Sequence, residues 1–235
     1  MTVVRLWLLL GVCLFFCCSI STAHAANHAP VVERVIAVLP SAQLQLEHTG
    51  NAVLADVVFP SPEGATQWLS EYALQRETAL TIGKEDRYGR VLVRGQLQQD
   101  MLNDGAAVFY ATDAPIDPAW RMAEARARSK KYGVWSDPKL TLVASSNNAA
   151  NYHGRFALIE GVITRIYEGK EGTYLNFGED WHEDFSIAIS PKLRRSMKAF
   201  LSTLKAGDRV RVRGTVVEEN GPMIRLNHAD NLEKL

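Results

Sequence analysis

Three arginines stand at alternate positions near the end of the chain, as Arg209, Arg211 and Arg213. Alternate residues of a β-strand point to the same face, so this spacing predicts a strand with a stripe of guanidinium groups. Proteins that bind single-stranded nucleic acid combine such a basic groove with aromatic side chains on which bases stack. Aromatic residues available for such stacking are Tyr167, Tyr174, Phe177, Trp181 and Phe185, although several of them should lie in the core. The same stripe is also typical of the solvent face of any half-buried strand, because valines alternate with the arginines.

Residues 178–184 form a second polar segment, Gly178-Glu179-Asp180-Trp181-His182-Glu183-Asp184. Carboxylates and an imidazole are possible metal ligands, but this spacing fits no specific metal-binding pattern. We therefore expect a solvated connection between two strands and no metal site. The sequence also contains no Ser-His-Asp signature, phosphate loop or dinucleotide fingerprint.

The elements around the arginine stripe follow a recognisable order. Apolar and β-branched residues predict strands at 155–167, 172–177, 184–189, 209–217 and 222–226. Between the third and fourth of these strands, Ser190-Pro191 predicts the start of a helix that Gly207 ends. Three strands, a helix and two strands is the order of an OB-type barrel, which we assign to residues 153–235.

The first part of the chain has a similar alternation of elements. Strands are expected at 35–39, 43–47, 53–59, 78–82 and 91–97. A helix is expected at 63–74, and another at 119–131, where Asp117 caps the start, Pro118 occupies the first turn and Gly133 follows the end. These elements define a domain at 31–142. Residues 144–151 are small and polar without apolar periodicity, and they predict a linker between the two domains at 143–152.

Three segments of the first domain carry a family resemblance. The most specific is Asp86-Arg87-Tyr88-Gly89-Arg90, followed by an apolar strand at 91–93. The second is 101–110, and the third runs from 123 to 128 and closes with Gly133-Val134-Trp135. In this order they resemble the thermonuclease (staphylococcal-nuclease-like) family over residues 33–138. The resemblance implies a mainly β (α+β) fold: a staphylococcal-nuclease-like OB barrel with helices, followed here by a second OB-like five-stranded barrel.

The resemblance also implies a chemistry that can be sought residue by residue. Nucleases of this family hold calcium with carboxylates, use a glutamate as general base and grip the phosphate with two arginines. Where the family has an acidic first turn, this chain reads Leu39-Pro40-Ser41-Ala42-Gln43, without a carboxylate.

The segment at 53–63 admits two alignments with the family's third strand. One alignment places Val53, Val58 and Ser61 at the positions of the first arginine, the metal-binding aspartate and the glutamate. A shifted alignment restores a candidate base at Glu63 but leaves Ala55 and Pro60 at the other two positions.

Arg90 is retained in either alignment. Arg90 and Glu63 are therefore vestigial catalytic candidates, and Arg90, Tyr88 and Tyr110 are ligand-binding candidates along with the arginine stripe. The alternative for Arg90 is that it only braces the turn after Gly89. No metal ligands are assigned.

The charge balance gives no support for a strongly nucleic-acid-binding protein. Lys and Arg total 26, and Asp and Glu total 26. Residues 26–145 carry 12 basic and 14 acidic residues, and residues 146–235 carry 13 and 12. Nonspecific nucleic-acid binding rests mainly on phosphate neutralisation and usually shows a basic excess.

The first 25 residues have the pattern of a secretory signal peptide. Arg5 precedes an apolar run at 6–16, and Ala23-His24-Ala25 provides a cleavage site. An uncleaved anchor is the alternative, although the run is short for a membrane span. A lipoprotein is a further alternative, but Phe16 stands where a small residue should precede the lipidated cysteine. All three cysteines of the chain lie in this segment, so we expect an exported, periplasmic or secreted protein without thiols or a membrane span.

These observations predict an exported, non-catalytic nuclease-like protein that serves as a binding or scaffold module. Its ligand would be a nucleic acid, a glycan or an envelope protein, and the oligomeric state is not specified. The alternative is a calcium-dependent phosphodiesterase acting on DNA or RNA through Glu63 and Arg90. No cofactor is expected, and calcium is required only under that alternative.

Overall fold

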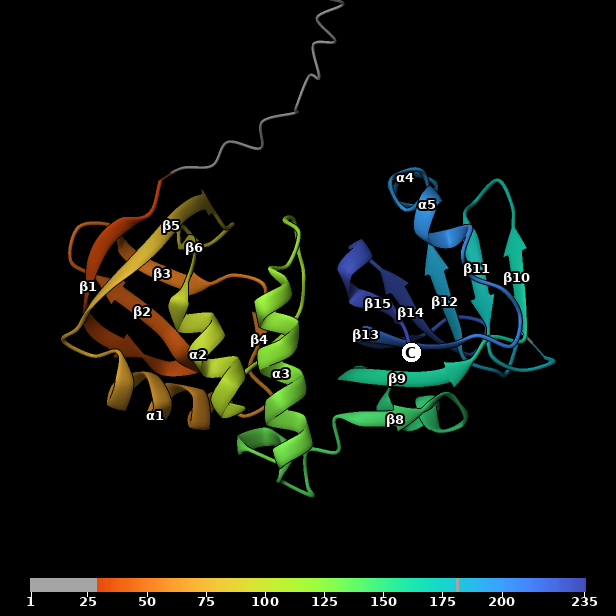
Figure 1. Ribbon diagram of the computed structural model, residues 1–235, viewed down its shortest axis with the longest axis horizontal. Coiled ribbons are helices and arrows are strands. Elements are labelled where there is room, and N and C mark those ends of the chain that lie inside the picture. The colour runs from red at the N-terminus through yellow and green to blue at the C-terminus, as the bar shows by residue number, and fades with distance from the viewer. Residues whose placement is uncertain (1–28, 181) are drawn as a thin grey trace, which may run out of the picture.

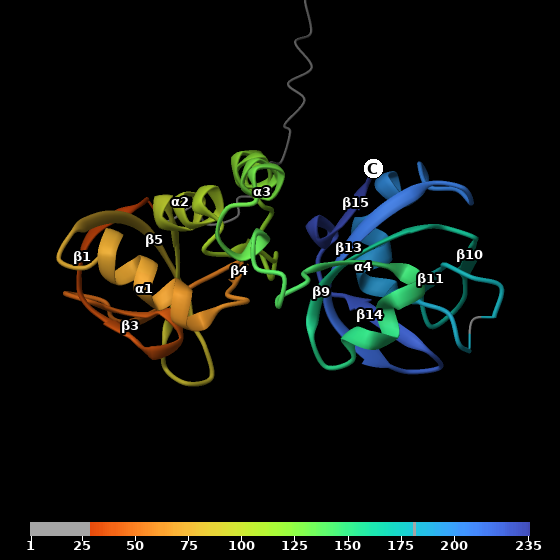
Figure 2. The ribbon, with the colours of Figure 1, turned by 90° about the horizontal axis from the view of Figure 1, so that it is seen from below.

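The structure is a computed structural model that describes residues 29–180 and 182–235. The expected signal peptide, its cysteines and Trp181 lie outside the described residues. A closed five-stranded barrel and a curved eight-stranded sheet, called the second barrel below, stand side by side, with the helix α3 between them in both views (Figures 1 and 2).

The first barrel is a closed five-stranded sheet in the order β1-β2-β3-β6-β5. Its strands are β1 (Val31–Leu39), β2 (Gln43–Leu46), β3 (Gly50–Leu54), β5 (Glu77–Glu85) and β6 (Val91–Gly95). Neighbouring strands are antiparallel except β3 and β6, which run parallel. The interior is apolar, with Leu44, Leu69, Leu80 and Val93 fully buried. The predicted closed barrel for this half is confirmed.

Three helices accompany this barrel. They are α1 (Pro62–Tyr72), α2 (Gln96–Asp104) and α3 (Pro118–Lys130), with the short turns η1 (Pro40–Ala42) and η2 (Gly133–Trp135). Ser61 caps α1 by accepting a hydrogen bond from the Gly64 amide at 3.2 Å, and Asp117 caps α3 through the Ala119 amide at 2.8 Å. The predicted strand at 53–59 is interrupted, because Asp56 has a φ of 59° and the chain turns there before β4 (Val57–Val58). β4 pairs with β7 (Val108–Phe109).

The second sheet follows the order β10-β11-β12-β14-β13-β9-β8. Its strands are β8 (Val143–Ser145), β9 (Phe156–Val162), β10 (Arg165–Glu168), β11 (Thr173–Asn176), β12 (Ser186–Ile189), β13 (Arg209–Glu218), β14 (Pro222–Leu226) and β15 (Leu232–Lys234), which pairs with β13. Only two residues separate β9 from β10, so these two strands act as one bent strand. This bent strand pairs with β11 at one end and with β13 at the other. The expected single helix is divided at Met197 into α4 (Pro191–Ser196) and α5 (Lys198–Leu201).

The two barrels share one strand plan when β9 and β10 are counted as one strand and the short strands β4, β7, β8 and β15 are left out. In each, the third strand pairs in parallel with the fifth, β3 with β6 and β12 with β14. In each, the fourth strand pairs with the first, β5 with β1 and β13 with β9. Helix also lies between the third and fourth strands in both. The chain is therefore a tandem of OB-type sheets.

The prediction of an unpacked linker at 143–152 was wrong. β8 pairs in parallel with β9, and the turn η3 (Ser146–Tyr152) continues directly from it. Ala144, Ala149 and Tyr152 are buried in the core of the second sheet. The small residues are needed for close approach, since a Cβ on Gly161 would meet the Ser146 side chain at 2.6 Å.

A third apolar cluster joins the two barrels. Val108 and Val134 of the first domain pack with Leu142 and with Leu158 of β9. Within the part of the chain that the structure describes, no helix is long and apolar enough to cross a bilayer.

Candidate functional site

The hairpin between β5 and β6 contains the retained family arginine. Asp86 Oδ1 accepts hydrogen bonds from the amides of Tyr88 at 2.8 Å and Arg90 at 3.0 Å. Asp86 Oδ2 accepts a bond from Arg90 Nε at 2.8 Å. The side-chain hydrogen bond from Arg90 lowers the pKa of Asp86 below its ordinary value. The guanidinium of Arg90 is thus engaged in closing its own turn.

An exposed tyrosine sits at the tip of the same hairpin. The Tyr88 side chain is 65% exposed, and the guanidinium carbons of Arg87 and Arg90 lie 4.7 and 5.1 Å from its ring centre. These are cation–π distances, which orient the two arginines around the ring. The tip therefore offers one aromatic ring flanked by two cations, one of which Asp86 neutralises.

Tyr110, the other tyrosine candidate, lies at the boundary between the barrels. Its ring meets Phe156 of β9 edge-on, with centres 5.4 Å apart. Burial raises its pKa. Tyr110 packs on the second barrel, whereas Tyr88 belongs to the exposed hairpin. The two candidate tyrosines therefore do not belong to one binding site.

Glu63 occupies the first turn of α1 and is exposed. A carboxylate is favourable there because the helix N-terminus carries partial positive charge. Among the described residues no hydrogen bond or ion pair links Glu63 to Arg90. Likewise, no group of three or more His, Cys, Asp or Glu side chains in residues 29–180 and 182–235 is placed to hold a metal ion.

The turn that is acidic in the family has a structural role in this chain. Residues 40–42 form η1, and Ala42 is buried. The Ala42 amide donates a hydrogen bond to Thr66 Oγ1 of α1 at 2.9 Å. The segment therefore anchors the first helix to the barrel.

A buried acidic residue that the sequence reasoning missed lies next to the first domain's third strand. Asp56 is 3% exposed and accepts hydrogen bonds from Arg94 Nε and from both the amide and the hydroxyl of Thr112, the last two at 2.8 and 2.6 Å. Arg94 also pairs with Asp113, which Lys84 contacts at 2.8 Å. The hydrogen bond from Lys84 and the charge of Arg94 lower the pKa of Asp113. The sequence does show Asp56 as an acidic residue inside an apolar run. Its partners Arg94 and Thr112 are distant in the sequence, so the pattern did not predict these contacts.

The arginine stripe does lie on one face of β13, but that face is turned toward carboxylates. Arg209 and Arg211 pair with Glu160 of β9 at 2.7 and 2.5 Å, and Arg211 also contacts Glu233 at 2.8 Å. Arg213 is 2% exposed and pairs with Glu124 of α3 at 2.9 Å. Of the two interpretations of this stripe, the open basic groove does not fit the contacts, because Arg211 and Arg213 are largely covered and all three arginines are ion-paired.

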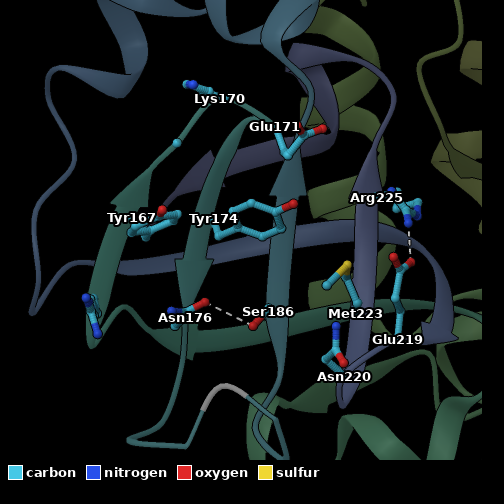
Figure 3. Close-up of a pocket in the computed structure, with 12 residues that line it drawn as sticks. Tyr167, Lys170, Glu171, Tyr174, Asn176, Ser186, Glu219, Asn220, Met223 and Arg225 are labelled. Carbon is cyan, nitrogen blue, oxygen red and sulfur yellow. Dashed lines mark hydrogen bonds and ion pairs between the residues drawn. The ribbon is translucent and has the colours of Figure 1, made fainter.

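A pocket opens instead on the outer face of β10, β11, β12 and β14, with a volume of about 460 Å³. Figure 3 shows Tyr174 across its middle, with Tyr167 on one side and Met223 on the other. The two tyrosine rings have centres 6.4 Å apart and are inclined by 39°. At one end Ser186 Oγ donates a hydrogen bond to Asn176 Oδ1 at 3.0 Å. Arg225 and Glu219 form an ion pair on the side opposite Tyr167 (Figure 3).

The acidic segment at 178–184 connects β11 to β12. The His182 amide donates to Asp180 Oδ1 at 2.9 Å, and the ring Nδ1 lies 3.1 Å from the same oxygen. The backbone hydrogen bond from His182 lowers the pKa of Asp180. These contacts order the connection locally.

Comparison with known proteins gives matches within the first domain. Residues 48–137 match the family model described as staphylococcal nuclease homologue. "Probable endonuclease LCL3" of Colletotrichum graminicola is 30% identical over 91 residues, 33% of this chain and 33% of that protein. "Probable endonuclease lcl3" of Botryotinia fuckeliana is 33% identical over 94 residues, 34% of this chain and 36% of that protein. The chain thus spans about a third of the length of the curated relatives it matches.

Residues 48–137 are thus similar to the staphylococcal nuclease family, as the three sequence segments predicted. The matched residues end before β8, so they do not include the second sheet or the pocket on it.

Proposed function

We propose that this protein is a nuclease-like binding or scaffold module without hydrolytic activity of its own. The observation that carries the proposal is the engagement of Arg90 with Asp86 inside a single turn. A guanidinium that is paired with a neighbouring carboxylate is not available to bind a phosphate. Arg90 is the one phosphate-binding arginine of the family that either alignment retains.

The donor set at the family's calcium position does not fit calcium. Calcium prefers six to eight oxygen ligands with several carboxylates. Here the first turn contributes Pro40, Ser41 and Ala42, and the aspartate position is Val58 or Pro60. Phosphodiester cleavage needs charge compensation on the phosphate as well as a base for water. Glu63 would supply the base alone.

The scaffold part of the proposal is supported by the contacts between the barrels. Arg213 and Glu124 pair in a buried position, and Asn231 of the second domain accepts a hydrogen bond from the Ala111 amide at 2.9 Å. These contacts hold the hairpin of the first barrel and the pocket of the second barrel in a fixed arrangement.

A nuclease assay tests the absence of activity. Purified protein is incubated with single- and double-stranded DNA and with RNA, with calcium or with a chelator. We expect no calcium-dependent products above background. Calcium-stimulated cleavage that disappears in Glu63→Ala, but persists in the matched Glu71→Ala control on the same helix, would establish the competing nuclease function.

We also propose that the protein is exported after cleavage behind Ala25. The support is the pattern of Arg5, the apolar run at 6–16 and the small residues Ala23 and Ala25. N-terminal sequencing of the exported form should begin at or near Ala26. A protein that retains Cys17 or Cys18 would overturn both the cleavage and the expectation of a chain without thiols.

A further inference from the structure

We infer that the pocket on β10, β11, β12 and β14 binds single-stranded nucleic acid, with a base stacked on its two tyrosines. This inference rests on the proposed binding function and gives it a ligand class and a location. The pocket volume of about 460 Å³ is in the range of small-ligand sites. β10 and β11 also lie at the end of the molecule away from α3, so the first barrel does not cover them (Figures 1 and 2).

The tyrosine pair supplies the stacking surface. Tyr167 is 51% exposed although it belongs to a strand, and Tyr174 lies beside it with ring centres 6.4 Å apart. Among the described residues, neither hydroxyl has a hydrogen-bond partner. Large aromatic rings left exposed on a sheet face are suited to stacking, and every base offers a π-face.

The polar end of the pocket supplies hydrogen bonds to a base edge. Asn176 and Ser186 are 9% and 3% exposed, and both line the pocket. The Ser186 hydroxyl donates to Asn176 Oδ1, which orients the amide and leaves its NH₂ group as a donor. That NH₂ group makes no hydrogen bond to other described residues. A base carbonyl or ring nitrogen is an acceptor of the required kind.

The charges at the rim favour a phosphate-bearing ligand over a neutral glycan. Arg165, Lys170 and Arg225 line the pocket together with Glu171 and Glu219. Arg225 and Glu219 neutralise each other as an ion pair. In the described part of the chain Arg165, Lys170 and Glu171 have no ion-pair partner, so two cations face one carboxylate. This surplus matches a backbone with one negative charge per nucleotide.

The binding test uses the purified full chain and a fluorescently labelled 12-nucleotide oligothymidylate, followed by anisotropy at several salt concentrations. We expect saturable binding that weakens as salt rises. Tyr174→Ala should raise Kd about 5- to 100-fold, because stacking is lost. Tyr174→Phe keeps the ring and should stay within about twofold. Tyr72→Ala, an exposed tyrosine on α1, should behave as the unaltered protein.

A charge variant gives a second and independent measurement. Lys170→Ala should reduce the slope of log K against log salt by about 0.7, the value for one contact to single-stranded phosphate. Circular dichroism of each variant verifies that the fold is retained.

Several results would overturn the inference. One is absence of salt-dependent binding, and another is binding that resists Tyr174→Ala but is lost in Arg90→Ala, which would move the site to the hairpin. Displacement of the oligonucleotide by a neutral oligosaccharide, or binding of that sugar alone, would assign the pocket to a glycan. Gel analysis of the oligonucleotide after titration separates the two proposals. Calcium-dependent cleavage refutes the non-catalytic function, whereas an intact but unbound oligonucleotide refutes only this ligand.

Discussion

The guanidinium of Arg213 and the carboxylate of Glu124 meet at 2.9 Å across the boundary between the two barrels, with side-chain exposures of 2% and 3%. Arg213 Nη1 also donates to the Phe109 carbonyl at 3.1 Å, and Glu124 Oε2 accepts the Phe109 amide at 2.9 Å. The pair is thus tied to the backbone of β7 as well as to itself. Because both side chains are buried, water cannot solvate one charge if the other is removed. The stability of each barrel therefore depends on the residue that the other barrel contributes.

Removing one partner of this pair should be costly. We expect Arg213→Ala to lower the free energy of unfolding by about 3–5 kcal/mol, because Glu124 is left buried without its counter-charge. Arg209→Ala is the matched control on the same strand, where the 62% exposed side chain should cost less than about 1 kcal/mol. Urea unfolding followed by fluorescence measures both. Equal losses in the two variants would contradict the role of the buried pair.

A combined variant distinguishes loss of the pair from loss of packing. Arg213→Met with Glu124→Leu should recover most of the stability lost in Arg213→Ala, since buried ion pairs are often replaceable by apolar side chains. No recovery would indicate that the bonds to Phe109 matter more than the charges.

Gly105 should resist substitution because two backbone segments meet there. Its φ is 69°, and a Cβ would collide with the Tyr132 carbonyl, while its own carbonyl accepts the Val134 amide at 2.9 Å. We expect Gly105→Ala to cost more than about 2 kcal/mol. Gly154→Ala is the control, with a φ of 72° and nothing within 4 Å, and should show only the backbone strain of about 1–2 kcal/mol. Thermal unfolding of both variants compares them, and a smaller loss at Gly105 would contradict the close approach.

Acid should destabilise the protein by protonating carboxylates that are paired with the arginines of β13, Glu233 among them. Burial alone would raise the pKa of Glu233, but the charge of Arg213 and the hydrogen bond from Arg211 outweigh it and hold the pKa below its ordinary value of 4.5. A lowered folded-state pKa contributes stability above the unfolded value, and this contribution is lost as the pH falls through the folded value. The free energy of unfolding should therefore decline below about pH 4.5.

Unfolding in urea between pH 7 and pH 3 measures this decline. Glu233→Gln should be less stable at pH 7 and should show a flatter dependence on pH. An unchanged slope in this variant would show that Glu233 is not among the groups that bind the protons.

The segment at 145–151 should resist proteolysis. Ala149 and Tyr152 are buried and β8 is paired with β9, so cleavage there requires opening of the second core. We expect a protease of broad specificity to cut first within 86–89, where Arg87 and Tyr88 are exposed. Mass spectrometry of the first fragments identifies the site. An initial cut between 145 and 151 would contradict this expectation and would indicate that the segment is an exposed linker.

The arginine stripe illustrates how far the sequence could be followed. Alternation correctly places Arg209, Arg211 and Arg213 on one face, because the period of a strand is a local property. What covers that face depends on Glu124, which lies 89 positions before Arg213 in the chain. No local pattern indicates that pairing, so the sequence left a binding groove and a solvent-exposed strand face as the two interpretations and did not predict an interface.

The strand order and the family of the first barrel were predictable for a different reason. Turn residues, apolar alternation and helix caps act within a few positions, and Asp117 and Ser61 cap their helices as local rules require. Composition misled at 143–152, where small polar residues permit close packing against Gly161 instead of marking an open chain.

The turn at Asp86 has a consequence for any anion that approaches the hairpin. Asp86 is a competitor attached to the same chain, so its effective concentration beside Arg90 does not fall on dilution of the protein. A phosphate in solution must displace it in an exchange of one anion for another, with little net gain in charge pairing. Arg90 is therefore a masked cation, and replacement of Asp86 by a neutral residue is the change that would unmask it.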